Sequence, residues 1–274
     1  MKCLALLAFV QTVSSLLTAP FGLGRRSCSR KTQLHATDRR SFFTSGAILG
    51  FSSLVLPSSP AYAEGKGKVV VVGGAGYVGA HVDQLLSAQG YKVVSVSRSS
   101  PSDQASKVQA ILGTTLPIEY QSLDASTDDL SSVLQGASAV VSCVGIIPGG
   151  KNQLNGNGAV NVRIAQQTKA AGIDRFVYVS VASELASGPA KFLLKDYFQG
   201  KAQAEAAVQS NFGPTQSLLV KPAIIAGGPP GELRPPGPPG MTAVPVQAVA
   251  KAVAAGATGA LSGSIDGNAA ISAL

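Results

Sequence analysis

The chain has 274 residues and a formal net charge of +8 at pH 7. The first 63 residues carry seven basic residues against one acidic residue, whereas the rest carries fifteen against thirteen. The excess charge therefore lies in the N-terminal segment, and the remainder lacks the broad basic surface that nucleic acids require, so we expect no nucleic-acid partner. After residue 63 the only cysteine is Cys143, which excludes an intramolecular disulfide there. The only histidine in this part is His81, and the absence of a His/Cys cluster argues against a metal site.

The first 63 residues resemble targeting signals in series. Residues 4–10 form an apolar run that is typical of a secretory signal peptide and too short to span a bilayer. The Arg-, Ser- and Thr-rich stretch after it is typical of a plastid transit peptide. Arg39-Arg40, the apolar residues 47–56 and the small-x-small site at 61–63 then resemble a twin-arginine thylakoid signal. We predict a plastid protein of the thylakoid lumen. The alternatives are the stroma or thylakoid surface, and a single membrane anchor at 47–56.

Predicted strands and helices alternate through residues 64–226, which indicates an α/β domain with a doubly wound parallel sheet, the Rossmann fold. The predicted strands are Lys68–Val72, Lys92–Val96, Ile118–Ser122, Ala139–Cys143, Phe176–Ser180 and Ser217–Lys221. The predicted helices are Tyr77–Gln89, Ser102–Leu112, Ser126–Leu134, Gly158–Ala171 and Phe198–Ser210. Residues 148–157 read as a loop, 227–240 as a Pro/Gly-rich linker, and 241–274 as a short C-terminal segment with a helix at Val244–Ala255.

Three glycines spaced by three follow the first predicted strand. The β-branched run Val69–Val72 leads into Gly73, Gly76 and Gly79, and an amphipathic helical pattern follows. Glycines at these positions let the backbone turn tightly and approach a pyrophosphate that sits on the N-terminus of the helix. We therefore predict a dinucleotide site whose cofactor-binding residues include Gly73, Gly76, Tyr77, Val78 and Gly79.

The end of the second predicted strand favours NADP(H) over NAD(H). No acid is present there to accept the free ribose 2′-hydroxyl, whereas Arg98 is placed to bind a 2′-phosphate with Ser97 beside it. Asp124 is a second candidate, either for the adenine amino group or as a helix N-cap partner. Cys143, Val144 and Gly145 follow the fourth strand and would pass beneath the adenosine ribose.

The main catalytic candidates are Tyr197 and Lys201. Two residues four apart share one face of a helix, so the Lys201 ammonium is expected to lower the pKa of the Tyr197 phenol while it holds the nicotinamide ribose. Such a tyrosine donates a proton to a carbonyl as hydride arrives. Gly200, inside this helical turn, costs about 1 kcal/mol relative to alanine, which suggests a close approach to the cofactor.

These features together resemble an atypical, extended-type short-chain dehydrogenase/reductase. The resemblance rests on the glycine turn, Ser142–Gly145, Asn157-Gly158, Arg175–Ser180, Tyr197 with Lys201, and Lys221-Pro222. It is strongest to the branch that includes the nucleotide-binding accessory subunit of respiratory complex I and a mitochondrial quinone-pathway protein. It implies a Rossmann domain that binds NADP or NAD, with Pro222 near the cofactor. The chain departs from the family in its abbreviated C-terminal substrate lobe, where the Pro/Gly-rich segment stands in place of helices.

One family position differs, and it leaves two functions open. Val181 stands where the family serine orients the substrate carbonyl, so Ser180 or Ser183 would have to substitute. The first function is an NADP(H)-dependent reductase or dehydrogenase acting on a carbonyl of a small or prenylated plastid molecule. The second is a binding protein in which NADP(H) is structural or sensory and the chain supports a membrane or quinone-pathway complex.

Overall fold

The computed structural model describes residues 66–188, 190–232 and 241–274. The predicted targeting signals, and the part of the predicted linker at 233–240, lie outside these residues.

The described residues form one seven-stranded, all-parallel sheet, which confirms the predicted fold class. The strand order is β3-β2-β1-β4-β5-β6-β7. The chain therefore adds strands to one side of β1 and then crosses to the other, and the crevice at the carboxyl ends of β1 and β4 is where such sheets bind ligands. The strands are β1 (Lys68–Val72), β2 (Lys92–Ser97), β3 (Glu119–Ser122), β4 (Ala137–Ser142), β5 (Phe176–Val179), β6 (Ser217–Lys221) and β7 (Gly263–Asp266).

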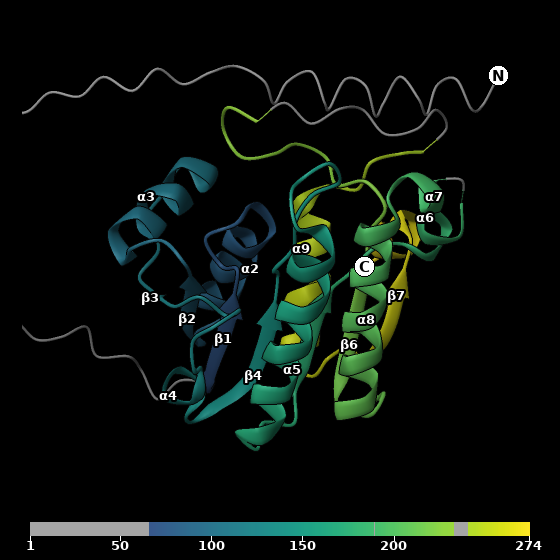
Figure 1. Cartoon of the computed structure of the whole chain (residues 1–274). Coiled ribbons are helices and arrows are strands. Elements are labelled where there is room, and N and C mark those ends of the chain that lie inside the picture. The colour runs from purple at the N-terminus through teal and green to yellow at the C-terminus, as the bar shows by residue number, and fades with distance from the viewer. Residues whose placement is uncertain (1–65, 189, 233–240) are drawn as a thin grey trace, which may run out of the picture.

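Helices cover both faces of the sheet (Figure 1). The side chains of Val69 and Val71 pack with α2 (Tyr77–Ala88) and α9 (Val246–Ala257), because alternate residues of a strand point to opposite faces. Val70 and Val72 pack on the other face with α4, α5 and α8. The remaining bounds are α3 (Pro101–Leu112), α4 (Ser131–Leu134), η1 (Asn155–Ala159, a π-helix), α5 (Val160–Ala170), α6 (Ser183–Ser187), α7 (Ala190–Leu193), α8 (Lys195–Asn211) and α10 (Asn268–Ser272).

Two predicted elements differ from the structure, and one strand was not predicted. The helix predicted from Ser126 begins only at Ser131, because the Asp124 and Asp129 carboxylates accept hydrogen bonds from backbone N–H groups two residues ahead and hold turns there. The predicted loop 148–157 ends in η1. Strand β7 was not predicted at all, and it extends the sheet beyond β6.

The two flanks of the Pro/Gly-rich segment are held side by side. The backbone N–H of Ala226 donates to the carbonyl of Val244 at 2.8 Å, and the N–H of Val244 donates to the carbonyl of Ile224 at 2.8 Å. Val244 is also buried in the core that α9 shares with β1. Residues 224–226 and Val244, on either side of this segment, are therefore joined by backbone hydrogen bonds.

A buried carboxyl group lies beneath the glycine turn. Asp83 on α2 is fully buried, and a Cβ added at Gly74 would contact both Asp83 Oδ2 and Ser95 Oγ, so these two polar groups converge there. Burial raises the pKa of Asp83 well above its usual range, and the Ser95 hydroxyl offsets this only in part. Neither carboxyl oxygen has a well-aligned hydrogen-bond partner among the described residues.

We expect Asp83→Asn to change the pH dependence of stability. Because the folded-state pKa of Asp83 is raised, the folded chain binds more protons than the unfolded chain between the two pKa values. The contribution of Asp83 to the free energy of unfolding is therefore largest below about pH 4. It falls by about 1.4 kcal/mol per pH unit as the pH rises through this window. In urea unfolding at several pH values, the free energy of unfolding of Asp83→Asn should rise relative to that of the wild type as the pH rises. The exposed Glu184→Gln is the control; parallel pH profiles for wild type and Asp83→Asn would contradict the expectation.

Candidate functional site

The glycine turn packs directly on the carboxyl end of β4. Gly73 has a φ of +84°, and a Cβ at this residue would lie 3.0 Å from the carbonyl carbon of Cys143 and 3.1 Å from the nitrogen of Val144. A Cβ at Gly79 would overlap the Gly73 carbonyl oxygen. Only glycine fits at these two positions. The predicted cofactor-binding residues that follow β1 therefore lie beside those that follow β4.

The N-terminus of α2 suits an anion. Its N-cap is Gly76, which supplies no side-chain cap, and no acidic residue occurs in the first turn. First-turn N–H groups of a helix have no acceptor within the helix, and the helix dipole favours negative charge there. The residues present thus fit a dinucleotide pyrophosphate. Tyr77 donates from its hydroxyl to the carbonyl of Ala226 at 3.1 Å, while Val78 packs against the core.

The end of β2 brings together the residues predicted to bind the adenosine ribose. Ser97 Oγ accepts from the backbone N–H of Ala75 at 3.4 Å, which ties β2 to the glycine turn. The exposed Arg98 lies near enough to Asp124 to help lower the pKa of that carboxyl, although hydrogen bonds from Ser126 are the larger cause. Asp124 caps a turn at Ser126 and not a helix, so its predicted role as a helix N-cap partner is wrong.

Two buried asparagines position the loop after β4, and the sequence analysis assigned no role to either side chain. Asn157 exchanges hydrogen bonds with both backbone groups of Ile146, at 3.0 Å each. Asn161 donates to the carbonyl of Val144 at 3.2 Å and accepts from Ser142 Oγ at 2.6 Å. A buried amide satisfied in this way fixes the backbone of 144–146. The one signal in the sequence is that they lie four apart, on one helical face.

Lys201 reaches this fixed loop from α8. Its side chain is buried, its Nζ donates to the Val179 carbonyl at 3.0 Å, and the ammonium lies 5.0 Å from the centre of the Tyr178 ring. A Cβ added at Gly145 would lie 3.2 Å from Nζ, so the ammonium sits over Gly145. Burial lowers the pKa of Lys201 to about 8, with Glu205 opposing the shift. Lys201 and Gly145, two residues predicted to bind the cofactor, therefore lie side by side.

Tyr197 differs from its predicted state. Burial raises the pKa of its phenol to about 12, so the expectation that Lys201 lowers this pKa is wrong. The ring packs edge-on against Phe198, with 5.1 Å between the ring centres. Desolvation of the phenol accounts for this shift, and the Lys201 ammonium donates to the Val179 carbonyl at 3.0 Å.

A cavity of about 320 Å³ opens beside Lys201. It is lined by polar and charged side chains from α6, α7, α8 and β6 and by a few apolar ones, and Tyr197, Ser180 and Pro222 are not among them. Its lining residues are Val181, Ser183, Ala186, Ser187, Lys191, Phe198, Lys201, Ala202, Glu205 and Lys221. Of the residues predicted to be catalytic, the structure thus brings Ser183 and Lys201 to one cavity.

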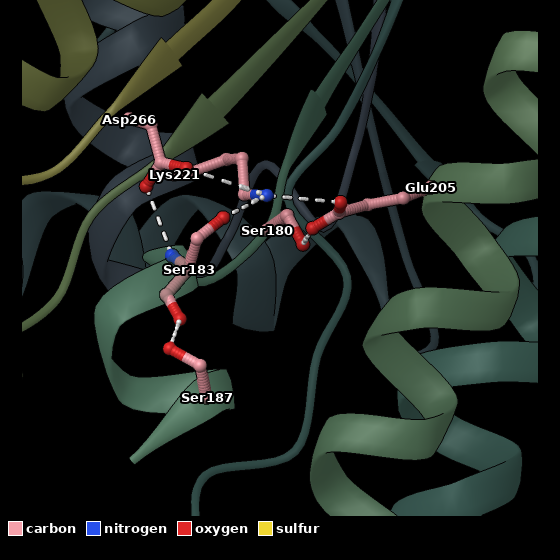
Figure 2. A network of polar contacts seen from close by, with 6 residues as sticks. All are labelled: Ser180, Ser183, Ser187, Glu205, Lys221 and Asp266. Atoms are coloured by element: carbon pink, nitrogen blue, oxygen red, sulfur yellow. Dashed lines mark hydrogen bonds and ion pairs between the residues drawn. The ribbon is translucent and has the colours of Figure 1, made fainter.

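Lys221 organises the polar wall of this cavity (Figure 2). Its Nζ lies 3.1 Å from Glu205 Oε2 and 3.6 Å from Asp266 Oδ2, and it donates to Ser183 Oγ at 2.8 Å. Ser180 Oγ donates to the other carboxylate oxygen of Glu205 at 2.5 Å. The sequence analysis noted Lys221 only as part of a family match and missed Glu205, which lies four residues after Lys201 on the same helix face.

Gly200 marks a close contact between helices, whereas the sequence analysis expected a contact with the cofactor. A Cβ at Gly200 would lie 2.9 Å from the Leu154 carbonyl oxygen and 3.0 Å from the nitrogen of Gly158. A Cβ at Gly158 would lie 3.0 Å from the Cα of Gly200. The two glycines let α8 approach the backbone of η1.

Comparison with known proteins assigns the class to which this fold and site belong. Residues 73–258 match the family model described as NAD(P)H-binding, and the chain therefore belongs to this family of Rossmann-type, atypical short-chain dehydrogenases/reductases. Over 161 residues it is 34% identical to an uncharacterized chloroplastic protein of Arabidopsis thaliana, covering 58% of this chain and 51% of that protein. The chain thus spans about half the length of that relative. Vestitone reductase of Medicago sativa is 37% identical over 84 residues, which cover 31% of this chain and 25% of that enzyme.

Solved structures share the fold. A Bacillus halodurans protein assigned as an NAD-dependent epimerase/dehydratase superposes with a TM-score of 0.57 at 19% identity, covering 72% of this chain and 91% of its own. The Bordetella bronchiseptica enzyme WbmH, in complex with NAD⁺, gives a TM-score of 0.56 at 18% identity, covering 73% and 75%. Nothing in these comparisons places the chain in the complex I branch. No group of side chains able to hold a metal, and no helix long and apolar enough to cross a membrane, occurs within 66–188, 190–232 and 241–274.

We expect Gly200→Ala to destabilise the chain. Alanine is better than glycine in an isolated helix by about 1 kcal/mol, but here its methyl group would press on backbone atoms of Leu154 and Gly158 that cannot rotate away. The net loss should be about 1–3 kcal/mol, measured by urea unfolding.

Gly213→Ala is the matched control, because a Cβ there meets no atom within 4 Å and the residue has no positive φ. It should leave the free energy of unfolding unchanged or slightly raised. Equal stabilities for the two alanine variants would show that the α8–η1 contact is loose.

Proposed function

We propose that the chain is an NADP(H)-dependent reductase of a carbonyl group in a small or prenylated plastid compound, quinones included. The supporting observation is that the buried Lys201 ammonium joins two regions. It lies over Gly145, at the edge of the predicted dinucleotide site, and it lines the cavity that also holds Ser183.

In this proposal, different residues of the chain bind different parts of the dinucleotide. The glycine turn and the N-terminus of α2 hold the pyrophosphate, Arg98 and Ser97 take the 2′-phosphate, and Asp124 faces the adenine. Lys201 holds the nicotinamide ribose, Pro222 lies near the cofactor, and residues 143–145 pass beneath the adenosine ribose. When bound, the reduced dinucleotide supplies the hydride. The sequence assigns the proton to Tyr197, and its raised pKa keeps the phenol protonated, though it does not line the cavity.

We further propose that the protein works in a plastid, in the thylakoid lumen. The leader composition supports this, as does the chloroplastic Arabidopsis relative. A twin-arginine pathway carries folded proteins, which suits a protein that acquires its cofactor before transfer. The N-terminus of protein purified from the organelle is expected near Glu64. A start between residues 18 and 40 would place the protein in the stroma or on the stromal thylakoid surface.

One alternative function has support from particular residues. Val181 lines the cavity where the family has a serine, and Tyr197 does not line it. A chain with this site would serve as an NADP(H)-binding member of a membrane or quinone-pathway complex, as the resemblance to the complex I branch suggests. Tight cofactor retention without turnover on aldehydes, ketones or quinones would favour this function.

We expect calorimetric titration to show that NADPH binds more tightly than NADH and that Arg98→Ala removes the difference. Loss of a charge-assisted hydrogen bond to the 2′-phosphate should weaken NADPH binding by about 10–100-fold. NADH, which lacks this phosphate, should change by less than about twofold.

Lys107→Ala on α3 is the control for a general loss of positive charge, because Lys107 is exposed and lies on the helix that follows β2. Equal weakening of NADPH and NADH in Arg98→Ala would refute the assigned role of Arg98. Absence of binding by either nucleotide would refute the reductase and the cofactor-binding alternative together.

A further inference from the structure

The polar wall of the cavity holds six groups that could exchange a proton with a substrate: Ser183, Ser187, Lys191, Lys201, Glu205 and Lys221. The position that carries the family's serine holds Val181, which lines the same cavity and offers no hydroxyl. The hydrogen bonds of each group decide which one has a proton to donate.

Ser180 and Glu205 are engaged with each other. The Ser180 hydroxyl donates its proton to Glu205 Oε1 at 2.5 Å, and the residue is 5% exposed. Glu205 Oε2 in turn accepts from Lys221 at 3.1 Å. Both carboxylate oxygens of Glu205 are thus occupied as hydrogen-bond acceptors, one by a hydroxyl and one by an ammonium. This pair therefore shapes the wall and does not protonate the substrate.

Ser183 is held differently. Its Oγ accepts a hydrogen bond from the Lys221 ammonium at 2.8 Å, and its hydroxyl interacts with the Asp266 carboxylate without making a well-aligned hydrogen bond to an acceptor among the described residues. The backbone N–H of Ser183 donates to Asp266 Oδ1 at 2.9 Å, and Ser187 Oγ donates to the Ser183 carbonyl at 2.7 Å (Figure 2). Both backbone polar groups of Ser183 are therefore hydrogen-bonded. A hydroxyl that accepts from an ammonium is polarised toward donation.

We propose that Ser183 donates the proton to the substrate's carbonyl oxygen and that Lys221 acts through Ser183 as its positioning residue and proton source. This rests on the proposed reductase function. The carbonyl carbon receives a hydride, and with it an electron pair, from the reduced nicotinamide, and the carbon–oxygen π pair moves onto the oxygen. That oxygen takes the Ser183 proton, Ser183 Oγ takes a proton from the Lys221 ammonium, and Lys221 recovers a proton from water. The sum is one carbonyl, one hydride and one proton giving one alcohol.

Charge balance around Lys221 suits this role. The carboxylates of Glu205 and Asp266 both lie within ion-pair distance of its ammonium, at 3.1 Å and 3.6 Å. The side chain of Asp266 is 39% exposed, against 12% for Lys221, so water reaches the network from that side. Lys201 is engaged differently, because its Nζ donates to the Val179 carbonyl and has no carboxylate within ion-pair distance among the described residues.

The test compares variants of the full chain by NADPH turnover on a panel of aldehydes, ketones and benzoquinones, with NADPH affinity from calorimetry and thermal unfolding as separate readouts. Ser183→Ala should lower kcat by about 100-fold, while KM and the NADPH dissociation constant change by less than about threefold. Ser183→Thr retains the hydroxyl and should recover most of the lost rate.

Lys221→Met should lower kcat as much as Ser183→Ala, and the double variant should lose little more, because two groups that act as a unit are not additive. Lys221→Arg keeps the positive charge and the hydrogen-bond donors, so it should retain part of the rate. It also provides a variant to measure if Lys221→Met fails to fold. Ser187→Ala is the matched control on the same helix and should lose much less than Ser183→Ala, since its hydroxyl is engaged by a backbone carbonyl.

The outcomes separate the two proposals. If Ser183→Ala keeps kcat within about twofold while Tyr197→Phe loses it, the proton comes from Tyr197 and the role of Ser183 is overturned. A wild-type chain that binds NADPH but reduces no member of the panel overturns the reductase function and the role of Ser183 with it. A wild-type chain that does not bind NADPH overturns the cofactor assignment itself.

Discussion

The backbone contact between Gly158 and Gly200 determines where the reactive groups lie. An added Cβ at either residue would press on main-chain atoms of the other helix, so α8 comes as close to η1 as two backbones allow. At this separation the Lys201 side chain extends to Gly145, and Glu205, one turn further along, meets Lys221 from β6. A wider spacing of the helices would withdraw both side chains from the cavity together. The geometry of the site is therefore set by two residues that have no side chains.

The π-helix at Asn155–Ala159 is the other half of this contact. A π-turn is less stable than an α-turn and persists where surrounding contacts hold it. Here Asn157 supplies those contacts, because its buried amide bonds to both backbone groups of Ile146 and to the Gln153 carbonyl. The same residue thus supports the irregular helix and fixes the loop over which the Lys201 ammonium lies. The backbone of residues 144–146, η1 and α8 are therefore in direct contact with one another.

Much of the fold could be predicted from the sequence, because its signals are local. The run Val69–Val72 and the glycines after it predict a buried strand and a dinucleotide turn without reference to the rest of the chain. Strand β7 could not be predicted, since Gly263–Asp266 has one large apolar residue and pairs on one side only, with β6. Its place is decided by the tertiary partner and by Asn268, which bonds to the backbone of Ala223, Ile224 and Thr242.

The site could be predicted only in part, for a related reason. Helical spacing places Lys201 four residues after Tyr197, but it says nothing of what surrounds either side chain, and burial reverses the expected shift of the Tyr197 pKa. The network of Lys221, Glu205, Ser183 and Asp266 joins β6, α8, α6 and β7, four elements that no local pattern connects. The cavity is lined by Val181 and, two residues further along the chain, by Ser183, whose hydroxyl accepts a hydrogen bond from Lys221. Chemistry of this kind depends on which groups converge on the substrate, and convergence across four elements is visible only in the folded chain.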